Sequence, residues 1–170
     1  FSFGAGGAFV PLDLRQVATM AFADDAADDD TGGWTDQGAN DFRDMPLGHQ
    51  VLAGIPFTIL DPATNDGRAC IVLGDRRKPA FPKSVRVPVG ERVRRLYFLH
   101  TCAWAPPDGA TAFAYVIRNA LQAEFWMPVT VGQQVRDWWK RGLEPEGVYD
   151  MPDPASKRIP LRTRRVQRNL

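Results

Sequence analysis

The residues best suited to chemistry lie together in one acidic stretch, Asp24–Asp44. It contains three glycines, one arginine and one tryptophan, and its eight aspartates are Asp24, Asp25, Asp28, Asp29, Asp30, Asp36, Asp41 and Asp44. So many carboxylates repel one another unless water, arginine or a metal ion offsets their charge. Loops often contain the functional residues of a domain, because the scaffold beneath them only sets their positions. The acidic loop is therefore the first candidate for a site.

The first half of this loop is suited to calcium. Calcium takes about six to eight oxygen ligands from carboxylates, carbonyls and water on irregular loops. Six residues could supply several of these oxygens, and the four predicted ligands among them are Asp24, Asp25, Asp28 and Asp30; the other two are Asp29 and Thr31. The EF-hand pattern is absent, because Asp28–Gly32 has a glycine but no glutamate at the closing position. A structural calcium ion is one expectation, and a solvated acidic loop without an ion is the other.

The second half of the loop is suited to a ligand rich in hydroxyl groups. Trp34 follows two glycines, and an exposed indole can stack on the apolar face of a sugar ring. The polar candidates for sugar hydroxyls are Asp36, Gln37, Asn40 and Arg43, although such residues are also ordinary in turns. Trp104, in a later segment, is the second aromatic candidate. The alternative for Trp34 is a plug that folds back and closes one end of the core.

Catalytic motifs are sparse. Ser2, Ser84 and Ser156 lack the sequence context of a nucleophile elbow, and phosphate-binding glycine motifs are absent. If the chain is an enzyme, the expected carboxylate pair is Glu124, beside an aromatic pair, with Asp36 of the acidic loop. This alternative is a small glycosidase or lyase that acts on polysaccharide.

Histidine and cysteine give no metal-binding pattern. His49 stands beside a turn, and His100 lies within an apolar run, where a hydrogen-bonded core histidine is the expectation. The two cysteines, Cys70 and Cys102, lie in strand-like runs without metal-ligand spacing. Buried thiols are the first expectation for them, and one disulfide is the alternative.

Composition and charge argue against several partners. No apolar run approaches the roughly 20 residues of a membrane helix. The net charge of +1 conceals an asymmetry, because six bases and no acid in the last fourteen residues leave −5 for residues 1–156. An acidic body does not grip a phosphate backbone, so neither nucleic acid nor a membrane is an expected partner. The short Gly-rich start, Phe1–Val10, indicates either the remnant of a processed signal region or a simple boundary.

About seven to nine short β-type runs, joined by Gly, Pro and Asx turns, predict an all-β sandwich or jelly roll. Val93–Trp104 is the longest apolar run and predicts a central strand. Asn65-Asp66-Gly67 predicts a turn, with Arg68–Leu73 as the return strand of a hairpin. The predicted sandwich spans residues 1–141. Residues 142–170 are expected to form a proline-rich, basic extension or linker, because prolines prevent long regular elements there.

Several segments in this order resemble one group of proteins. They are Gly32–Gly38 (GGWTDQG), Gly54–Pro62, Cys70–Leu73, Leu96–His100 and Asp137–Trp139. Over about Val10–Trp139 the chain is similar to galactose-binding-like β-sandwich carbohydrate-binding modules of secreted bacterial polysaccharide-degrading enzymes. The resemblance implies a jelly roll, a non-catalytic role, a sugar ligand and often a structural calcium. Arg118–Gln122 departs from the Asp-Gly type of turn that is usual in the group.

The expected function is therefore a non-catalytic, secreted carbohydrate-binding module, placed outside the cell or in the periplasm. It would target a covalently attached glycoside hydrolase or lyase to polysaccharide. The alternatives are the small glycosidase or lyase described above and a purely structural inter-domain module.

Overall fold

The computed structural model describes residues 9–31, 33–52, 54–74, 78–93 and 95–138, together with the backbone of 2–3, 148–150 and 162–165. The chain divides into two compact units, residues 1–96 with 167–170 and residues 97–166, and each unit is described by itself. Among the described residues the regular structure is almost entirely strand, which confirms the predicted all-β class. The one helix in this part of the chain is a single 3-10 turn, too short to cross a membrane.

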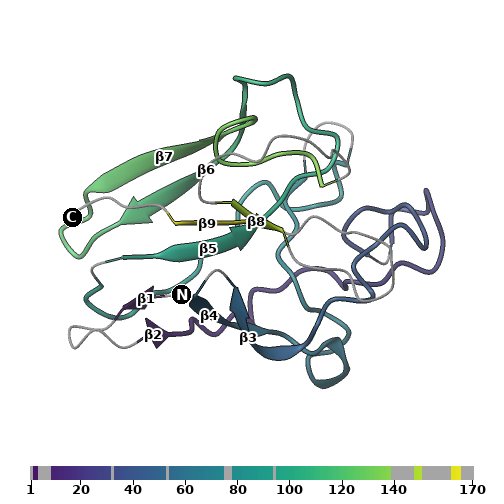
Figure 1. The fold of residues 1–170 in the computed structure, drawn as a ribbon, viewed down its shortest axis with the longest axis horizontal. Helices are drawn as coiled ribbons and strands as arrows, with labels where there is room; N and C mark the ends of the chain where they lie inside the picture. Colours follow the sequence, from purple (N-terminus) through teal and green to yellow (C-terminus); the bar gives the residue numbers. More distant parts are fainter. Residues whose placement is uncertain are drawn as a thin grey trace. The chain divides into compact units, whose positions relative to one another are not determined.

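The described strands are short and pair only antiparallel. In chain order they are β1 (Ser2–Phe3), β2 (Phe9–Val10), β3 (Gly48–Leu52), β4 (Ile55–Ile59), β5 (Tyr97–His100), β6 (Thr111–Arg118), β7 (Glu124–Thr130), β8 (Val148–Asp150) and β9 (Arg162–Arg165). β1 pairs with β2, β3 with β4 and β6 with β7, while β9 lies between β5 and β8 (Figure 1). These small sheets leave much of the first unit, including the acidic loop, to irregular backbone.

The β3–β4 hairpin provides the regular part of the first unit. Its strands pair from Gly48 opposite Ile59 to Leu52 opposite Ile55. Gly54, between them, has φ +76°, a conformation that disfavours a side chain. Phe57 and Ile59 are buried, while Thr58 between them is exposed, so the strand alternates as a half-buried strand should.

The return strand predicted at Arg68–Leu73 is wrong. The turn before it does form: the side chain of Asp61 accepts a hydrogen bond from the N–H of Ala63 at the start of η1 (Pro62–Thr64). Beyond that turn the chain does not pair with β4, and Cys70 instead forms an isolated antiparallel bridge with Met20. The local turn signal was correct, but the partner of the following segment is 50 residues away in the sequence.

The β6–β7 hairpin dominates the regular structure of the second unit (Figure 1). Asn119 closes its turn, because its side-chain oxygen accepts hydrogen bonds from the N–H groups of Leu121 and Ala123. Val129 of β7 forms a buried cluster with Val131 and Val135, and Phe113 and Tyr115 of β6 pack against this cluster. On the other face Val116 and Trp126 lie opposite each other and are exposed.

Two strands fall within the segment expected to be an extension, residues 142–170. The backbone of β9 pairs with β5 from Tyr97 opposite Arg165 to His100 opposite Arg162, and β8 pairs with the other edge of β9. Trp139 and the basic residues Lys157, Arg158 and Arg168 lie outside the described residues. The two strands β8 and β9 therefore belong to the same sheet as β5, in the second unit.

Candidate functional site

An aromatic core holds the acidic loop in shape. The indole of Trp34 stacks on the ring of Phe42, with centroids 4.3 Å apart and planes 10° from parallel, and Phe22 meets Phe42 edge-on. All three side chains are buried. Trp34 is therefore the plug of the loop rather than an exposed platform. The structure favours the alternative over the predicted stacking surface.

Three carboxylates lie inside this loop. Asp24, Asp36 and Asp41 are each at most 3% exposed, and Thr35 between them is fully buried, its hydroxyl donating to the carbonyl of Asn40. A buried carboxylate is destabilising unless hydrogen bonds or opposite charges compensate it. The hydrogen-bond and ion-pair partners of each carboxylate therefore show which negative charges in the loop are compensated and which are not.

Asp36 is fully partnered. Its two oxygens accept hydrogen bonds from the N–H groups of Asp29 at 3.0 Å and Asp30 at 3.3 Å. The ammonium group of Lys78 contacts Asp36 Oδ2 and lies 3.2 Å from Asp30 Oδ1. Burial raises the pKa of Asp36, but the hydrogen bonds from Lys78 and the two amides together outweigh it, so the pKa lies below the usual range.

Asp41 is also fully partnered. The guanidinium of Arg43 donates to both of its oxygens, and Asp41 Oδ2 also accepts the N–H of Asp24 at 2.6 Å. Arg43 Nη2 in addition donates to the backbone carbonyl of Asp24 at 2.7 Å. Burial raises the pKa of Asp41, yet the hydrogen bonds from Arg43 and the amide of Asp24 lower it further, below its usual range. Arg43 thus ties together two turns of the loop.

Asp24 is the exception. Its Oδ2 accepts the N–H of Gly38 at 2.7 Å, but its buried Oδ1 has no hydrogen-bond partner among the described residues. The backbone at Gly33 approaches so closely that a Cβ there would lie 2.7 Å from Cβ of Asp24. Only glycine fits this contact, so the packing keeps Asp24 in place. A buried, unpartnered carboxylate oxygen calls for an explanation, and an ion is one of the usual ones.

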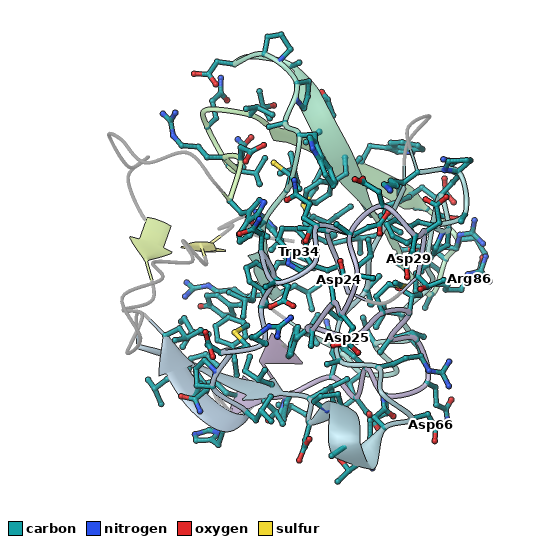
Figure 2. The ribbon with its side chains drawn as sticks, turned by 90° about the vertical axis from the view of Figure 1, so that its right-hand side faces the viewer. Asp24, Asp25, Asp29, Trp34, Asp66 and Arg86 are labelled. Carbon is teal, nitrogen blue, oxygen red and sulfur yellow. The ribbon has the colours of Figure 1, made fainter. Side chains whose placement is uncertain are left out.

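Asp24, Asp29 and Asp36 form a group that could hold a metal ion, because one carboxylate oxygen from each lies within 4.8 Å of the others. Calcium binds oxygen at about 2.3–2.6 Å, so one calcium ion can touch oxygens separated by up to about 5 Å. Asp29 is exposed, which leaves that side of the group open to water ligands. Figure 2 shows Asp24 and Asp29 in the same part of the loop. The residues present therefore fit a hard divalent cation.

The predicted metal ligands are only partly in this group. Asp24 belongs to it, while the other three, Asp25, Asp28 and Asp30, are exposed and lie outside it. Asp36, expected to bind sugar, and Asp29 complete the group instead. The physical reason lies in packing, since the stack of Trp34 on Phe42 and the close approach of Gly33 to Asp24 hold Asp24 and Asp36 on the buried side of the loop. Lys78 was missed, because nothing in the sequence places it near residue 36.

The polar residues that were predicted to bind a sugar mostly form hydrogen bonds or bridges within the acidic loop itself. Asp36 and Arg43 have the partners given above, and Asn40 is exposed but its carbonyl accepts the Thr35 hydroxyl. Gln37 is half-buried and its backbone bridges to Ala27. The structure thus brings these residues together as a scaffold around Trp34, without an exposed aromatic ring among them.

Of the two aromatic residues predicted to contact sugar, Trp104, in the second unit, is the one that reaches solvent. Its side chain is 42% exposed and its backbone has φ +51°, which is rare for a large side chain. The N–H of Ala105 donates to Asp137 Oδ2 at 2.8 Å, and the N–H of Trp138 donates to the carbonyl of Cys102 at 2.8 Å. These bonds fix the segment on both sides of Trp104.

The candidate acid Glu124 pairs across the β6–β7 hairpin with Arg118, whose Nε donates to it at 3.0 Å. Its expected catalytic partner Asp36 is buried in the ion pair with Lys78, in the first unit. Each carboxylate therefore already has a basic partner of its own.

The side chains of His100, Cys70 and Cys102 all contact neighbouring groups of the protein, as expected for residues with a structural role. Nε2 of His100 lies 3.0 Å from the carbonyl of Gln134, so it donates there, and Nδ1 then accepts from the hydroxyl of Tyr115 at 2.9 Å. Burial raises the pKa of Tyr115. Cys70 and Cys102 form no disulfide, and each thiol faces backbone carbonyl oxygens. The bridge considered as an alternative is therefore absent.

Comparison with protein-family models, with curated proteins and with solved structures gave no match. The resemblance to carbohydrate-binding modules thus stays an expectation from the sequence.

Proposed function

We propose that this chain is a non-catalytic carbohydrate-binding module that brings an attached glycoside hydrolase or lyase to polysaccharide. The observation that supports this most directly is Trp104, an exposed indole on a left-handed backbone. Such a conformation costs on the order of 1–3 kcal/mol for a residue other than glycine and is concentrated at ligand-binding sites. The secreted location and the jelly-roll arrangement of the sheets belong to the same proposal.

The segment around Trp104 is suited to stacking on a sugar because it is fixed in advance. Besides the bond from Ala105 to Asp137, two consecutive prolines, Pro106 and Pro107, restrict the backbone that follows. Further along, Asp108 faces Arg136 at 3.8 Å. A ring held in its bound orientation loses little conformational entropy on binding, so weak contacts with a sugar face yield more affinity.

Affinity electrophoresis against plant, algal and microbial polysaccharides tests this proposal. We expect the wild-type chain to be retarded by at least one glycan and Trp104→Ala to lose that retardation. Trp126→Ala is the matched control, because Trp126 is 67% exposed in the same unit but has an ordinary strand backbone. Retardation that survives Trp104→Ala, or its absence with every glycan, would contradict the proposal.

A calcium ion within the acidic loop is the second part of the proposal. It is supported by the unpartnered Oδ1 of Asp24 and by the spacing of the Asp24, Asp29 and Asp36 oxygens. The ion would be the positively charged partner that the Asp24 carboxylate lacks. It would also link the parts of the loop that contain Asp24, Asp29 and Asp36. Its role would be structural, because two of its three ligands, Asp24 and Asp36, are buried inside the loop.

A purely structural module is the second candidate function. The buried Trp34 favours it, as does the exposed face of the β6–β7 hairpin, where Val116 lies directly opposite Trp126. Exposed apolar neighbours of this kind are common where one domain packs on another. A module of this class would bind no glycan, and its isolated form would self-associate. Sedimentation of the wild type and of Trp126→Ser separates this candidate from the first.

A further inference from the structure

We propose that Lys78 is the resident counter-ion of the acidic loop and that a divalent cation displaces it from Asp36. This inference rests on the calcium part of the proposed function and adds how the site is regulated. It assigns a role to a lysine 42 residues from its partner in the sequence.

The position of Lys78 supports this role. Its side chain is only 19% exposed, and its ammonium lies between Asp36, which is completely buried, and Asp30. Asp36 also belongs to the group of three carboxylates that could hold a metal ion. The lysine and a divalent ion would therefore share one carboxylate. Two cations on the same carboxylate repel each other, so occupancy by one weakens the other.

The backbone that presents Lys78 is closed tightly around it. The N–H of Gly74 donates to the carbonyl of Pro82 at 3.1 Å, and that of Phe81 donates to the carbonyl of Lys78 at 3.3 Å. A Cβ at Gly74 would lie 2.2 Å from the oxygen of Lys78, so only glycine permits this turn. These contacts hold the backbone of Lys78 independently of its side chain, so losing the Asp36 contact would free the side chain without removing them.

The unpartnered Oδ1 of Asp24 shows what the lysine does not do. Lys78 neutralises Asp36 and Asp30 but leaves this buried oxygen without a partner among the described residues. One univalent ammonium cannot serve all the carboxylates of the group, whereas a divalent cation with several ligands can. Lys78 therefore substitutes only in part for the divalent cation, and it stabilises the loop when no ion is bound.

Calorimetric titration with Ca²⁺ alone tests the inference, using wild type, Lys78→Met and Lys83→Met after removal of divalent ions. Methionine keeps the length of the side chain without its charge, and Lys83 is an exposed lysine near the same turn. We expect Lys78→Met to bind Ca²⁺ about tenfold more tightly, the effect that one neighbouring charge commonly has on an equilibrium of this kind. Lys83→Met should match the wild type.

Acetylation of the wild-type chain gives a second readout that does not depend on a variant folding. We expect Ca²⁺ to raise the acetylation rate of Lys78 several-fold and to leave that of Lys83 unchanged. Equal Ca²⁺ affinity in wild type and Lys78→Met, with unchanged acetylation, overturns the displacement but leaves the calcium site. No Ca²⁺ binding by any variant overturns both. Binding by Lys78→Met alone would show that the lysine excludes the ion from the wild-type loop, which also overturns the displacement.

Discussion

The indole of Trp34 lies flat against the ring of Phe42, 4.3 Å between centroids and 10° between planes. This stack places the aromatic residue of the most distinctive sequence motif in the interior of the acidic loop. The consequence is that Trp34 maintains the positions of the surrounding carboxylates and does not itself meet a ligand at the surface.

Trp34→Ala should therefore destabilise the chain strongly. Removal of a buried tryptophan costs about 3–5 kcal/mol, since the apolar contact is lost and a cavity remains. Trp34→Phe, which keeps a ring on Phe42, should cost clearly less. Urea denaturation measures both, and a wild-type unfolding curve for Trp34→Ala would show that the stack contributes nothing.

Trp104→Gly should be more stable than Trp104→Ala. At φ +51° glycine has no steric penalty, and the difference from alanine is on the order of 1 kcal/mol. Both variants should lose glycan retention, because both lack the ring. Thermal melting compares their stability. Equal melting temperatures would indicate that the backbone relaxes when the indole is removed.

Chelation should lower the melting temperature. An ion at 100 times its dissociation constant contributes about 2.7 kcal/mol to the folded state, which for a chain of this size corresponds to about 5–10 °C. Exhaustive chelation followed by return of Ca²⁺ should reverse the change. Asp24→Asn should show a smaller response, while Asp44→Asn, at an exposed site outside the group, should respond as the wild type does. A melting curve unaffected by chelation removes the calcium part of the proposal.

Stability should fall in acid. The pKa values of Asp36 and Asp41 lie below their usual range, so the folded state releases these protons more readily than the unfolded state. Their contribution is complete above the unfolded value of about 4 and is lost as the pH falls through the folded values. Urea midpoints between pH 7 and pH 2 should show this decline. Asp41→Asn should reduce its steepness, and an unchanged slope would mean that Arg43 does not stabilise the charged form.

Cys70 should resist alkylation in the folded chain. Burial raises the pKa of its thiol to about 12, so little of the reactive thiolate exists near neutral pH. Because the folded value exceeds the unfolded one, this group also makes stability fall as the pH rises from about 9 towards 12. Iodoacetamide labelling with and without urea, read by mass spectrometry, checks the first point. Rapid labelling of Cys70 in native buffer would contradict it.

The sequence predicted the elements that depend on local chemistry. Short apolar runs between turn residues predicted an all-β chain, and Asp61 starts the expected turn because its side chain caps the following N–H group. The concentration of aspartates correctly marked the loop with the candidate metal group, since a metal site needs several carboxylates whatever their order.

The choice among those aspartates came only from the tertiary structure. Asp24 and Asp36 are buried while Asp25 and Asp28 of the same loop are exposed, because the stack of Trp34 on Phe42 and the close approach at Gly33 decide which side of the loop faces inward. Lys78 reaches Asp36 only through chain folding across 42 residues. The sequence by itself determined that charge would gather in this loop. Packing decided which carboxylates are shielded from water, and therefore which of them need a cation.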